Sequence, residues 1–338
     1  MKENILSTIS PAAIYRITAL WAFSEAFLGG LLHGLSIPFK GLILCSISVF
    51  CICMIGYYGN GRTDILKAMI LVILVKAALS PHTPPMAYIA VGFQGITGYL
   101  FFLSKRFFKI SCVLVFVLSL LETSLQKFIT ATLIFGSALW KAVNDFLKSA
   151  AEELHWNDVN ILVTIGIVYL SIYAIVGIVL GIFVSTIPKS MEKYSEENPN
   201  FKIDLNEEVD AQTIPKKKKR IKPFKILILT IISLLFLNYL FEIFPQFIPK
   251  DKSLQIFLRA ILFILFWLFV FSPLLKILFR KWLDKAKHKY AIQVKELVEF
   301  LPETRKILVL SYKKIKQEHG KFRIPAFVKL LTANLIYD

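Results

Sequence analysis

Long apolar runs constrain this chain more than any other feature of the sequence. Several segments of roughly 17 to 28 residues carry few or no charges, and an α-helix of that length crosses a ~30 Å hydrocarbon core. Hydrophobic residues make up 56% of the 338 residues, more than is usual for a soluble domain. The short alternating segments of a transmembrane β-barrel are absent. The sequence therefore predicts an all-α fold, a polytopic transmembrane helical bundle.

We expect about eight spanning helices from the positions of these runs. They lie near 12–34, 41–59, 65–80, 86–104, 107–126, 160–187, 224–248 and 254–279. A further stretch, 128–147, is apolar but interrupted by polar residues. It predicts either an amphipathic helix at the outer surface or a continuation of the fifth helix.

The basic residues indicate which side of the membrane each connection occupies. The chain has 40 Lys and Arg against 23 Asp and Glu, and the basic residues cluster in a few connections. Such clusters are typical of cytoplasmic flanks beside anionic lipid, so we expect membrane lipid as a partner and no nucleic acid. With the N-terminus inside, the basic connections 59–64, 104–109 and 188–225 and the tail all fall inside. The pattern predicts a multi-pass protein of the cell inner membrane with cytoplasmic N- and C-termini.

The composition changes abruptly after the sixth run and divides the chain. The segment 188–223 is polar and basic and predicts a cytoplasmic linker. Its run Lys216–Arg220 predicts a membrane-surface anchor or, alternatively, a docking site for a partner. The expected domains are a six-helix membrane unit (1–187), the linker (188–223), a two-helix membrane unit (224–279) and a tail (280–338).

The tail shows apolar residues at helical spacing among Lys and Glu, which predicts amphipathic cytoplasmic helices. We expect a helix break near Phe300, a new helix opened by Pro302, and its end at Gly320. Pro325 then starts a last apolar helix, 326–336.

Small residues recur every four positions in the first expected helix. Ala22, Ala26, Gly30 and Gly34 form one stripe, which lets another helix approach closely. The stripe predicts either packing inside the bundle or a docking surface for a separate subunit.

A few polar residues lie within or beside the expected spans. Charges in hydrocarbon usually face a partner or a cavity, and Lys76 and Glu122 have a similar predicted depth, whereas Glu25 is mid-helix. Lys76 and Glu122 are thus expected to form a structural ion pair, to extend their charged ends toward the membrane surface, or to line a solute cavity open to the outside. The connection after Lys76 is stiffened by three prolines. The candidate solute-binding residues are Lys76, His82, Thr83, Tyr88, Gln94 and Glu122.

No catalytic or metal-binding pattern is present in the sequence. The Ser-hydrolase, zinc-protease and phosphate-loop motifs are absent, and the five histidines are scattered. We therefore expect no enzyme activity, no metal and no cofactor. The four cysteines lie inside apolar runs and predict small buried core residues; they are Cys45, Cys51, Cys53 and Cys112.

The layout resembles that of an energy-coupling factor (ECF) transporter. The six-helix unit is similar to the substrate-binding S component, and Ala22-Phe-Ser-Glu-Ala26 resembles the Ala-x-x-x-Ala pattern through which S components meet their membrane partner. The second unit resembles part of the T component. Its Phe300-Leu301-Pro302 precedes a basic helix whose end, Gln317-Glu318-His319-Gly320, stands where the family has Ala-Arg-Gly. The resemblance implies a partner interface at Arg305, His319 and Gly320, and other membrane or cytoplasmic subunits, among them an ATPase, as partners.

The sequence thus favours a membrane transport subunit, ECF-like, which captures a small solute from outside and couples to a cytoplasmic partner. The alternative is a non-catalytic scaffold or assembly component of a multi-subunit inner-membrane complex.

Overall fold

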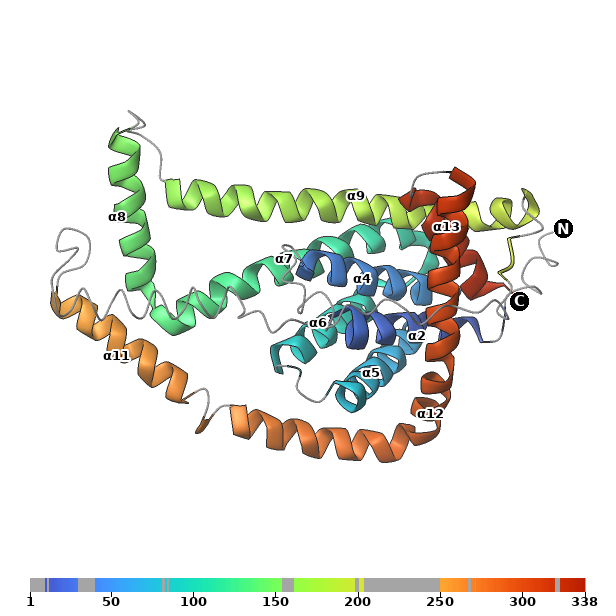
Figure 1. Cartoon of the computed structure of the whole chain (residues 1–338), viewed down its shortest axis with the longest axis horizontal. Helices are drawn as coiled ribbons and strands as arrows, with labels where there is room; N and C mark the ends of the chain where they lie inside the picture. Colours follow the sequence, from blue (N-terminus) through green and yellow to red (C-terminus); the bar gives the residue numbers. More distant parts are fainter. Residues whose placement is uncertain are drawn as a thin grey trace. The chain divides into compact units, whose positions relative to one another are not determined.

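The computed structural model is helical throughout its regular secondary structure, as predicted. It describes residues 10, 12–29, 40–80, 83, 85–153, 161–197, 201–203, 250–266, 269–270, 272–319 and 323–337. The helices in chain order (Figure 1) are α2 (Ala13–Phe23), η1 (Ser24–Leu28), α4 (Lys40–Tyr58), α5 (Arg62–Leu79), α6 (Pro85–Phe101), η2 (Lys105–Phe107), α7 (Phe108–Phe135), α8 (Ser137–Glu153), α9 (Ile161–Glu197), α11 (Lys250–Phe266), α12 (Ser272–His319) and α13 (Ile324–Ile336).

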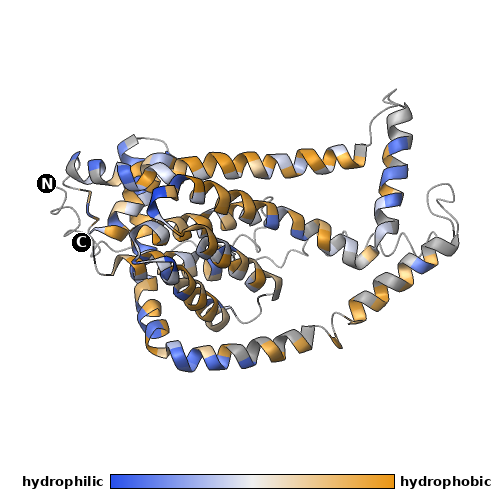
Figure 2. Cartoon of the chain, turned by 180° about the vertical axis from the view of Figure 1, so that it is seen from behind, coloured by the Kyte–Doolittle hydropathy of each residue, from blue (hydrophilic) through white to orange (hydrophobic). Residues whose placement is uncertain are grey.

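Three helical segments in the described residues are long and apolar enough to cross a membrane. They are Lys40–Tyr58, Lys105–Thr130 and Leu162–Met191. Two shorter apolar helices, Met86–Phe101 and Ile324–Ile336, accompany them. Figure 2 shows these helices as predominantly hydrophobic, whereas α8 and α12 carry hydrophilic residues along part of their surface. The apolar residues that favour a membrane protein are therefore concentrated in helices, three of them long enough to cross a membrane.

The chain divides into two compact units. Unit 1 comprises Met1–Leu120, Val176–Lys217 and Trp282–Asp338, and unit 2 comprises Leu121–Ile175 and Lys218–Lys281. The boundaries fall inside α7, α9 and α12. The domain boundaries expected from composition, at 187, 223 and 279, were placed at changes in polarity along the chain. They stay a prediction.

The first four helices of unit 1 pack closely because glycines open space between them. A Cβ atom on Gly95 of α6 would lie 2.5 Å from the Met69 side chain of α5. A Cβ atom on Gly98 would lie 2.4 Å from Ile52 of α4. Real Cβ atoms do not approach that closely, so α6 meets α4 and α5 through its glycine face. Helix α2 in turn packs against α4 and α5.

Helices α7 and α9 meet backbone to backbone within unit 1. A Cβ atom on Gly177 would lie 2.9 Å from the Cα atom of Val117, and one on Gly181 would lie 2.6 Å from the Cα atom of Val113. Because the numbers rise along α9 as they fall along α7, the two helices are antiparallel. The spacing Gly177-x-x-x-Gly181 is a pattern that brings membrane helices together, and it was not among the sequence predictions.

The basic connections of the first four helices of unit 1 meet at one end of the bundle. Arg62, at the start of α5, lies 4.7 Å from the ring centre of Tyr99 near the end of α6. Lys105 of η2 lies 5.8 Å from the ring of Tyr57 near the end of α4. The Tyr57 ring also contacts Phe108, the first residue of α7, with 5.0 Å between ring centres. These connections were expected to share one side of the membrane, and the structure places them together.

The tail packs against the start of α2 instead of standing apart. Arg16 of α2 pairs with Glu303 of α12, with 3.1 Å between Nε and Oε1. Tyr15 stacks on Phe300, with ring centres 6.3 Å apart. Helix α13 contacts α2, and the Ser10 backbone N–H donates to the Ile336 carbonyl at 2.9 Å. The tail is therefore an integral layer of unit 1.

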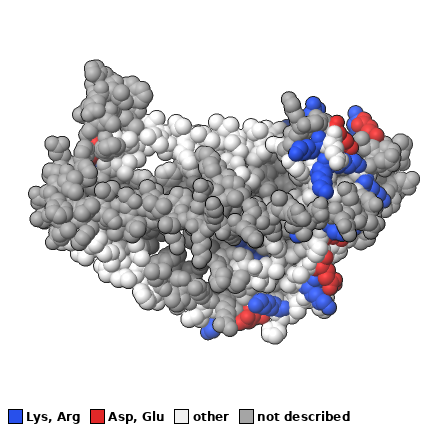
Figure 3. Space-filling model, viewed as in Figure 1, with Lys and Arg blue, Asp and Glu red and all other residues white. Residues whose placement is uncertain are grey.

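The last helix also holds the segment that follows α9. The Asn334 side chain accepts a hydrogen bond from the Ile203 N–H at 3.0 Å and donates one to the Phe201 carbonyl at 3.1 Å. At the far end of α9, burial and the negative charge of Glu318 raise the pKa of the Tyr194 phenol. On the face drawn in Figure 3, most charged side chains gather around α12 and the end of α9.

In unit 2, the stretch 128–147 is in part a continuation of α7 and in part a separate helix, whose expected position at the outer surface stays a prediction. Helix α7 continues to Phe135, and α8 then starts at Ser137 as a separate helix. Gly136 between them has φ 73°, a left-handed conformation that glycine adopts without steric cost. The Trp140 indole N–H donates to Thr132 Oγ1 at 2.8 Å across this turn, so α8 is fixed against the end of α7.

Two sequence expectations about helix ends are wrong. Helix α9 was expected to end at 187 but runs to Glu197, with Pro188 inside it. Its buried face continues through Ile187 and Met191, so packing extends the helix past the apolar run. In the expected span 254–279, the described residues 254–266, 269–270 and 272–279 are helical. Pro273 lies in the first turn of α12, a position that suits proline.

The expected break near Phe300 is absent. Helix α12 runs through Pro302, and its one residue with non-helical angles is Tyr290 (φ −116°, ψ 20°). Leu297, Leu301 and Ile307 are buried along one stripe, whereas Pro302 lies on the exposed side. The stripe keeps the helix continuous while the proline occupies a position where solvent reaches the backbone.

Several other helix predictions are confirmed, and two predictions concern residues that the structure does not describe. Helices α4, α5 and α6 confirm the second, third and fourth expected segments, and α13 confirms the last helix with its early proline. The four cysteines are free and buried, as predicted. The expected helix 224–248 and the run Lys216–Arg220 lie outside the described residues.

Candidate functional site

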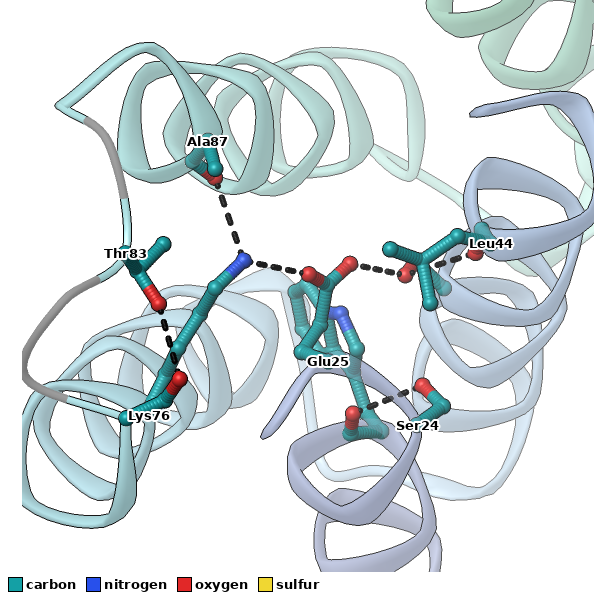
Figure 4. Close-up of polar contacts among 9 residues, drawn as sticks. Ser24, Glu25, Leu44, Lys76, Thr83 and Ala87 are labelled. Atoms are coloured by element: carbon teal, nitrogen blue, oxygen red, sulfur yellow. Dashed lines mark hydrogen bonds and ion pairs between the residues drawn. The ribbon is translucent and has the colours of Figure 1, made fainter. Parts of the chain in front are cut away.

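An ion pair between Glu25 and Lys76 is buried in the described part of unit 1. Glu25 lies in η1 and Lys76 near the end of α5, and they are 5% and 3% exposed. Lys76 Nζ lies 2.6 Å from Glu25 Oε2. Figure 4 shows the two side chains pointing toward one another between their helices. Burial makes the pair interdependent, because either charge alone would be costly in an apolar bundle.

A local widening of the first helix presents Glu25. The five residues Ser24–Leu28 form a π-helical turn directly after α2, and such turns interrupt the α-helical register and occur often at functional positions. The Ser24 hydroxyl donates to the Trp21 carbonyl at 2.8 Å, which satisfies an acceptor where the pattern changes. The turn therefore places a carboxylate where regular helix would continue.

The other carboxylate oxygen of Glu25 is bound by Ser48 of α4. The Ser48 hydroxyl donates to Glu25 Oε1 at 2.7 Å, and the carbonyl of Leu44 lies 3.1 Å from the same hydroxyl oxygen. A hydroxyl has one proton to donate and also accepts, so Ser48 has two acceptors in reach for one proton. Both oxygens of Glu25 are thus satisfied in the charged state.

Helix α6 completes the surroundings of Lys76. The Lys76 ammonium donates to the Ala87 carbonyl at 3.4 Å and lies 5.7 Å from the ring centre of Tyr88. Beside it, the Thr83 hydroxyl donates to Ser80 Oγ at 3.0 Å in the connection between α5 and α6. Four elements, η1, α4, α5 and α6, therefore converge on one charge-balanced cluster (Figure 4).

Two buried polar atoms on the same helices lack a partner in the described residues. They are Gln94 Oε1 on α6 and Trp21 Nε1 on α2, and these residues are 3% and 0% exposed. Trp21 precedes Glu25 by one turn, and Gln94 follows Ala87 by about two turns on the same face of α6. Buried polar groups without a partner are rare in folded proteins and call for an explanation. A ligand with matching groups would supply one.

The expected pairing of Lys76 with Glu122 is wrong. Lys76 pairs with Glu25, and Glu122 instead accepts a hydrogen bond from Gln126 on its own helix α7. The sequence prediction matched Lys76 to Glu122 by their depth in the membrane alone. Depth does not say which helices are neighbours. The π-helical turn, which no sequence period revealed, brings Glu25 to Lys76.

The structure brings some of the other predicted site residues together. Lys76, Thr83 and Tyr88 gather around the end of α5 and the start of α6, and Gln94 lies deeper on α6. His82 lies outside the described residues. Sequence reasoning missed Ser48 and Trp21, because serines and tryptophans in apolar runs carry no distinguishing pattern.

The predicted interface residues are partly internal. Ala22 is fully buried and Ala26 half-buried within unit 1, so at Ala22 the stripe packs inside the chain. Arg305 is exposed on α12, and His319 is the last residue of that helix. Gly30, Gly34 and Gly320 lie outside the described residues.

The fold and this cluster define a class: a helical chain with membrane-length apolar helices and a buried ion pair among its first helices. Searches against protein-family models, curated proteins and solved structures found no match.

Proposed function

We propose that this chain is a multi-pass membrane transport subunit that captures a small solute from the outside. The observation that carries the proposal is the buried cluster of Glu25, Lys76 and Ser48, with the unpartnered atoms of Trp21 and Gln94 on the adjoining helices. Intramembrane charges usually face a partner or a transported species. Here they are charge-balanced, and the two atoms without a partner in the described residues of α2 and α6 are a hydrogen-bond donor and an acceptor.

The proposal places the chain in the inner membrane with cytoplasmic N- and C-termini. The basic connections containing Arg62 and Lys105 lie at the same end of unit 1, and basic residues near spanning helices favour the cytoplasmic side. Lys76 and the connection after it lie at the opposite end of α5, so the cluster is nearer the outer face. A solute would enter from there.

Coupling to a cytoplasmic partner is assigned to the tail. Helix α12 is bound to the start of α2 through Arg16 and Glu303, and Glu25 follows directly after α2. A shift of α12 would therefore be transmitted to the helix that carries the carboxylate. The ECF-like arrangement, with an exposed coupling surface at Arg305 and an ATPase as partner, remains part of this proposal.

The test is extraction of small molecules from the purified full chain, followed by mass spectrometry. We expect a solute to copurify with the natural sequence and to be lost from the double variant Glu25→Gln/Lys76→Met, which removes both charges together. The matched control is Lys67→Met, since Lys67 lies on the same helix but is exposed and pairs with Asp64. A double variant that retains the same molecule in the same amount would overturn the proposed site.

A membrane scaffold is the second candidate, and one observation favours it. Glu25 and Lys76 satisfy each other with Ser48, so the cluster can stabilise the bundle without a ligand. Isolation of the chain from native membranes separates the candidates: a stable assembly holding neither solute nor ATPase supports the scaffold.

A further inference from the structure

We infer, building on the transport function proposed above, that the solute carries a carboxylate and binds together with one proton. The carboxylate takes the place of Glu25 at Lys76, and the proton goes to Glu25. The cluster is then an exchange site in which one protein carboxylate and one solute carboxylate compete for a single buried ammonium.

Charge balance requires the proton. The pair of Glu25 and Lys76 is neutral as a unit, and both groups are nearly fully buried. Addition of an anion alone would leave a net negative charge in an apolar bundle, which is strongly unfavourable. Neutralisation of Glu25 restores the balance, so the anion and the proton enter together.

Ser48 is arranged to accept both states of Glu25. In the charged state its hydroxyl donates to Glu25 Oε1. When Glu25 is protonated, its new O–H donates to Ser48 Oγ and the Ser48 proton turns to the Leu44 carbonyl, which already lies 3.1 Å away. Figure 4 shows this line of contacts from Lys76 through Glu25 to the end at Leu44. The contacts from Glu25 Oε1 through Ser48 to Leu44 are therefore kept, and only the contact of Glu25 Oε2 with Lys76 passes to the solute.

The exchange moves one proton and changes one ion pair. An O–H bond forms at Glu25, and the ion pair between Glu25 and Lys76 separates. The proton comes from bulk water, returns there when the anion leaves, and no electron is transferred. The Lys76 ammonium keeps its charge throughout, bound first by Glu25 and then by the solute.

Few other titratable groups face Glu25 in the described residues. Lys76 comes from α5, and Cys51 from α4 interacts electrostatically with the carboxylate. From α6, Tyr88 faces Lys76, while the adjoining turn of α2 offers Trp21, which does not titrate. Free thiols and phenols are neutral near pH 7, so Glu25 is the group that takes the proton.

The two buried atoms without a partner in the described residues indicate which other hydrogen-bonding groups the solute carries. Trp21 Nε1 is a donor one turn from Glu25, and it suits an acceptor near the solute carboxylate. Gln94 Oε1 is an acceptor roughly 10 Å further along α6 from Ala87, counted at 1.5 Å per residue. The chemical class is therefore a small monocarboxylate with a hydrogen-bond donor toward its other end.

The experiment measures binding and proton uptake in the same sample. The purified full chain in weakly buffered detergent is titrated with acetate, 4-hydroxybutyrate and benzoate, and with the amide of each acid as a neutral match. Melting temperature reports binding, and a pH-indicator dye reports protons. We expect the carboxylates to raise the melting temperature and to drive the uptake of about one proton per bound anion. The amides should do neither.

Three variants locate the proton and the anion. Glu25→Gln should bind carboxylates without proton uptake and with affinity independent of pH, since its side chain is permanently neutral. The double variant Glu25→Gln/Lys76→Met, which leaves no buried unpaired charge, should bind no carboxylate. Asp64→Asn, a change at a carboxyl group at the other end of α5 that pairs with Lys67, should keep both binding and proton uptake.

The inference is overturned by carboxylate binding without proton uptake, by equal binding of the amides, by proton uptake lost in Asp64→Asn, or by no binding of any probe. The solute extraction described above judges the transport function separately. A neutral solute that copurifies would leave that function in place while this inference fails.

Discussion

An ammonium and a carboxylate buried side by side set the charge state of each other, and that constraint governs the residue scale. Removal of one partner of a buried pair typically costs about 3–5 kcal/mol, whereas removal of both costs far less. Lys76 and Glu25 are each nearly fully buried, so this asymmetry applies to them fully.

At the residue scale, the variant Gln94→Leu distinguishes a contribution of Gln94 to stability from a contribution to solute binding. Leucine removes an acceptor that lacks a partner among the described residues. We therefore expect the empty chain to gain stability by about 1 kcal/mol, because an unsatisfied buried polar group is lost. Solute retention should fall about tenfold, the effect of one lost hydrogen bond of about 1.4 kcal/mol. Thermal unfolding and the extraction assay measure the two effects. Unchanged retention with changed stability would assign Gln94 to packing alone.

The sequence revealed which residues are unusual but not which of them meet. A lysine and two glutamates in apolar runs were evident, since charges are rare there. The partner of Lys76 depends on the π-helical turn at Ser24–Leu28 and on how α2 lies beside α5, and neither leaves a periodic signal. Ser48 became visible only through its distance to Glu25.

At the element scale, helix contacts in this chain depend on glycine. Gly181→Leu should separate α9 from α7, since a Cβ atom alone would already lie 2.6 Å from the Cα atom of Val113. We expect a loss of at least about 2 kcal/mol in stability, as for other overpacked contacts. The control is Gly166→Leu on the same helix, because a Cβ atom there meets nothing within 4 Å. Equal melting temperatures for the two variants would contradict the close contact.

The tail contact also belongs to this scale. Arg16→Met removes the pair with Glu303, whose side chain is 27% exposed. We expect a loss of about 1 kcal/mol, because partly exposed pairs are screened by solvent. Limited proteolysis should cut α12 faster in Arg16→Met than in Arg305→Met, where the side chain is exposed. Equal rates would indicate that the ion pair with Glu303 does not hold the tail.

The existence of helices could be predicted from the sequence, and several of their ends could not. Apolar length placed α4, α5 and α6 correctly, since each fills one run between turn residues. Pro188 and Pro302 lie inside helices because buried stripes continue on the other side of each. Such tertiary packing overrides a local break signal, and only the folded chain shows it.

At the scale of the whole molecule, sidedness connects the cluster to its solute. We expect single cysteines placed at Arg62 and Lys105 to react with a membrane-impermeant maleimide only after the cytoplasmic side is opened. The four native cysteines are buried and should contribute little background. Labelling of either site from outside intact cells would reverse the orientation and remove the proposed route of entry.

The most direct test of the account is a double-mutant cycle on the buried pair. It compares the stability of the purified chain with Glu25→Gln, Lys76→Met and both changes together. The account predicts that each single change lowers the free energy of unfolding by about 3 kcal/mol or more. The loss in the double variant should be smaller than the sum of the two single losses by at least about 2 kcal/mol. Losses that simply add would show that Glu25 and Lys76 do not meet, and the site built on them would not exist.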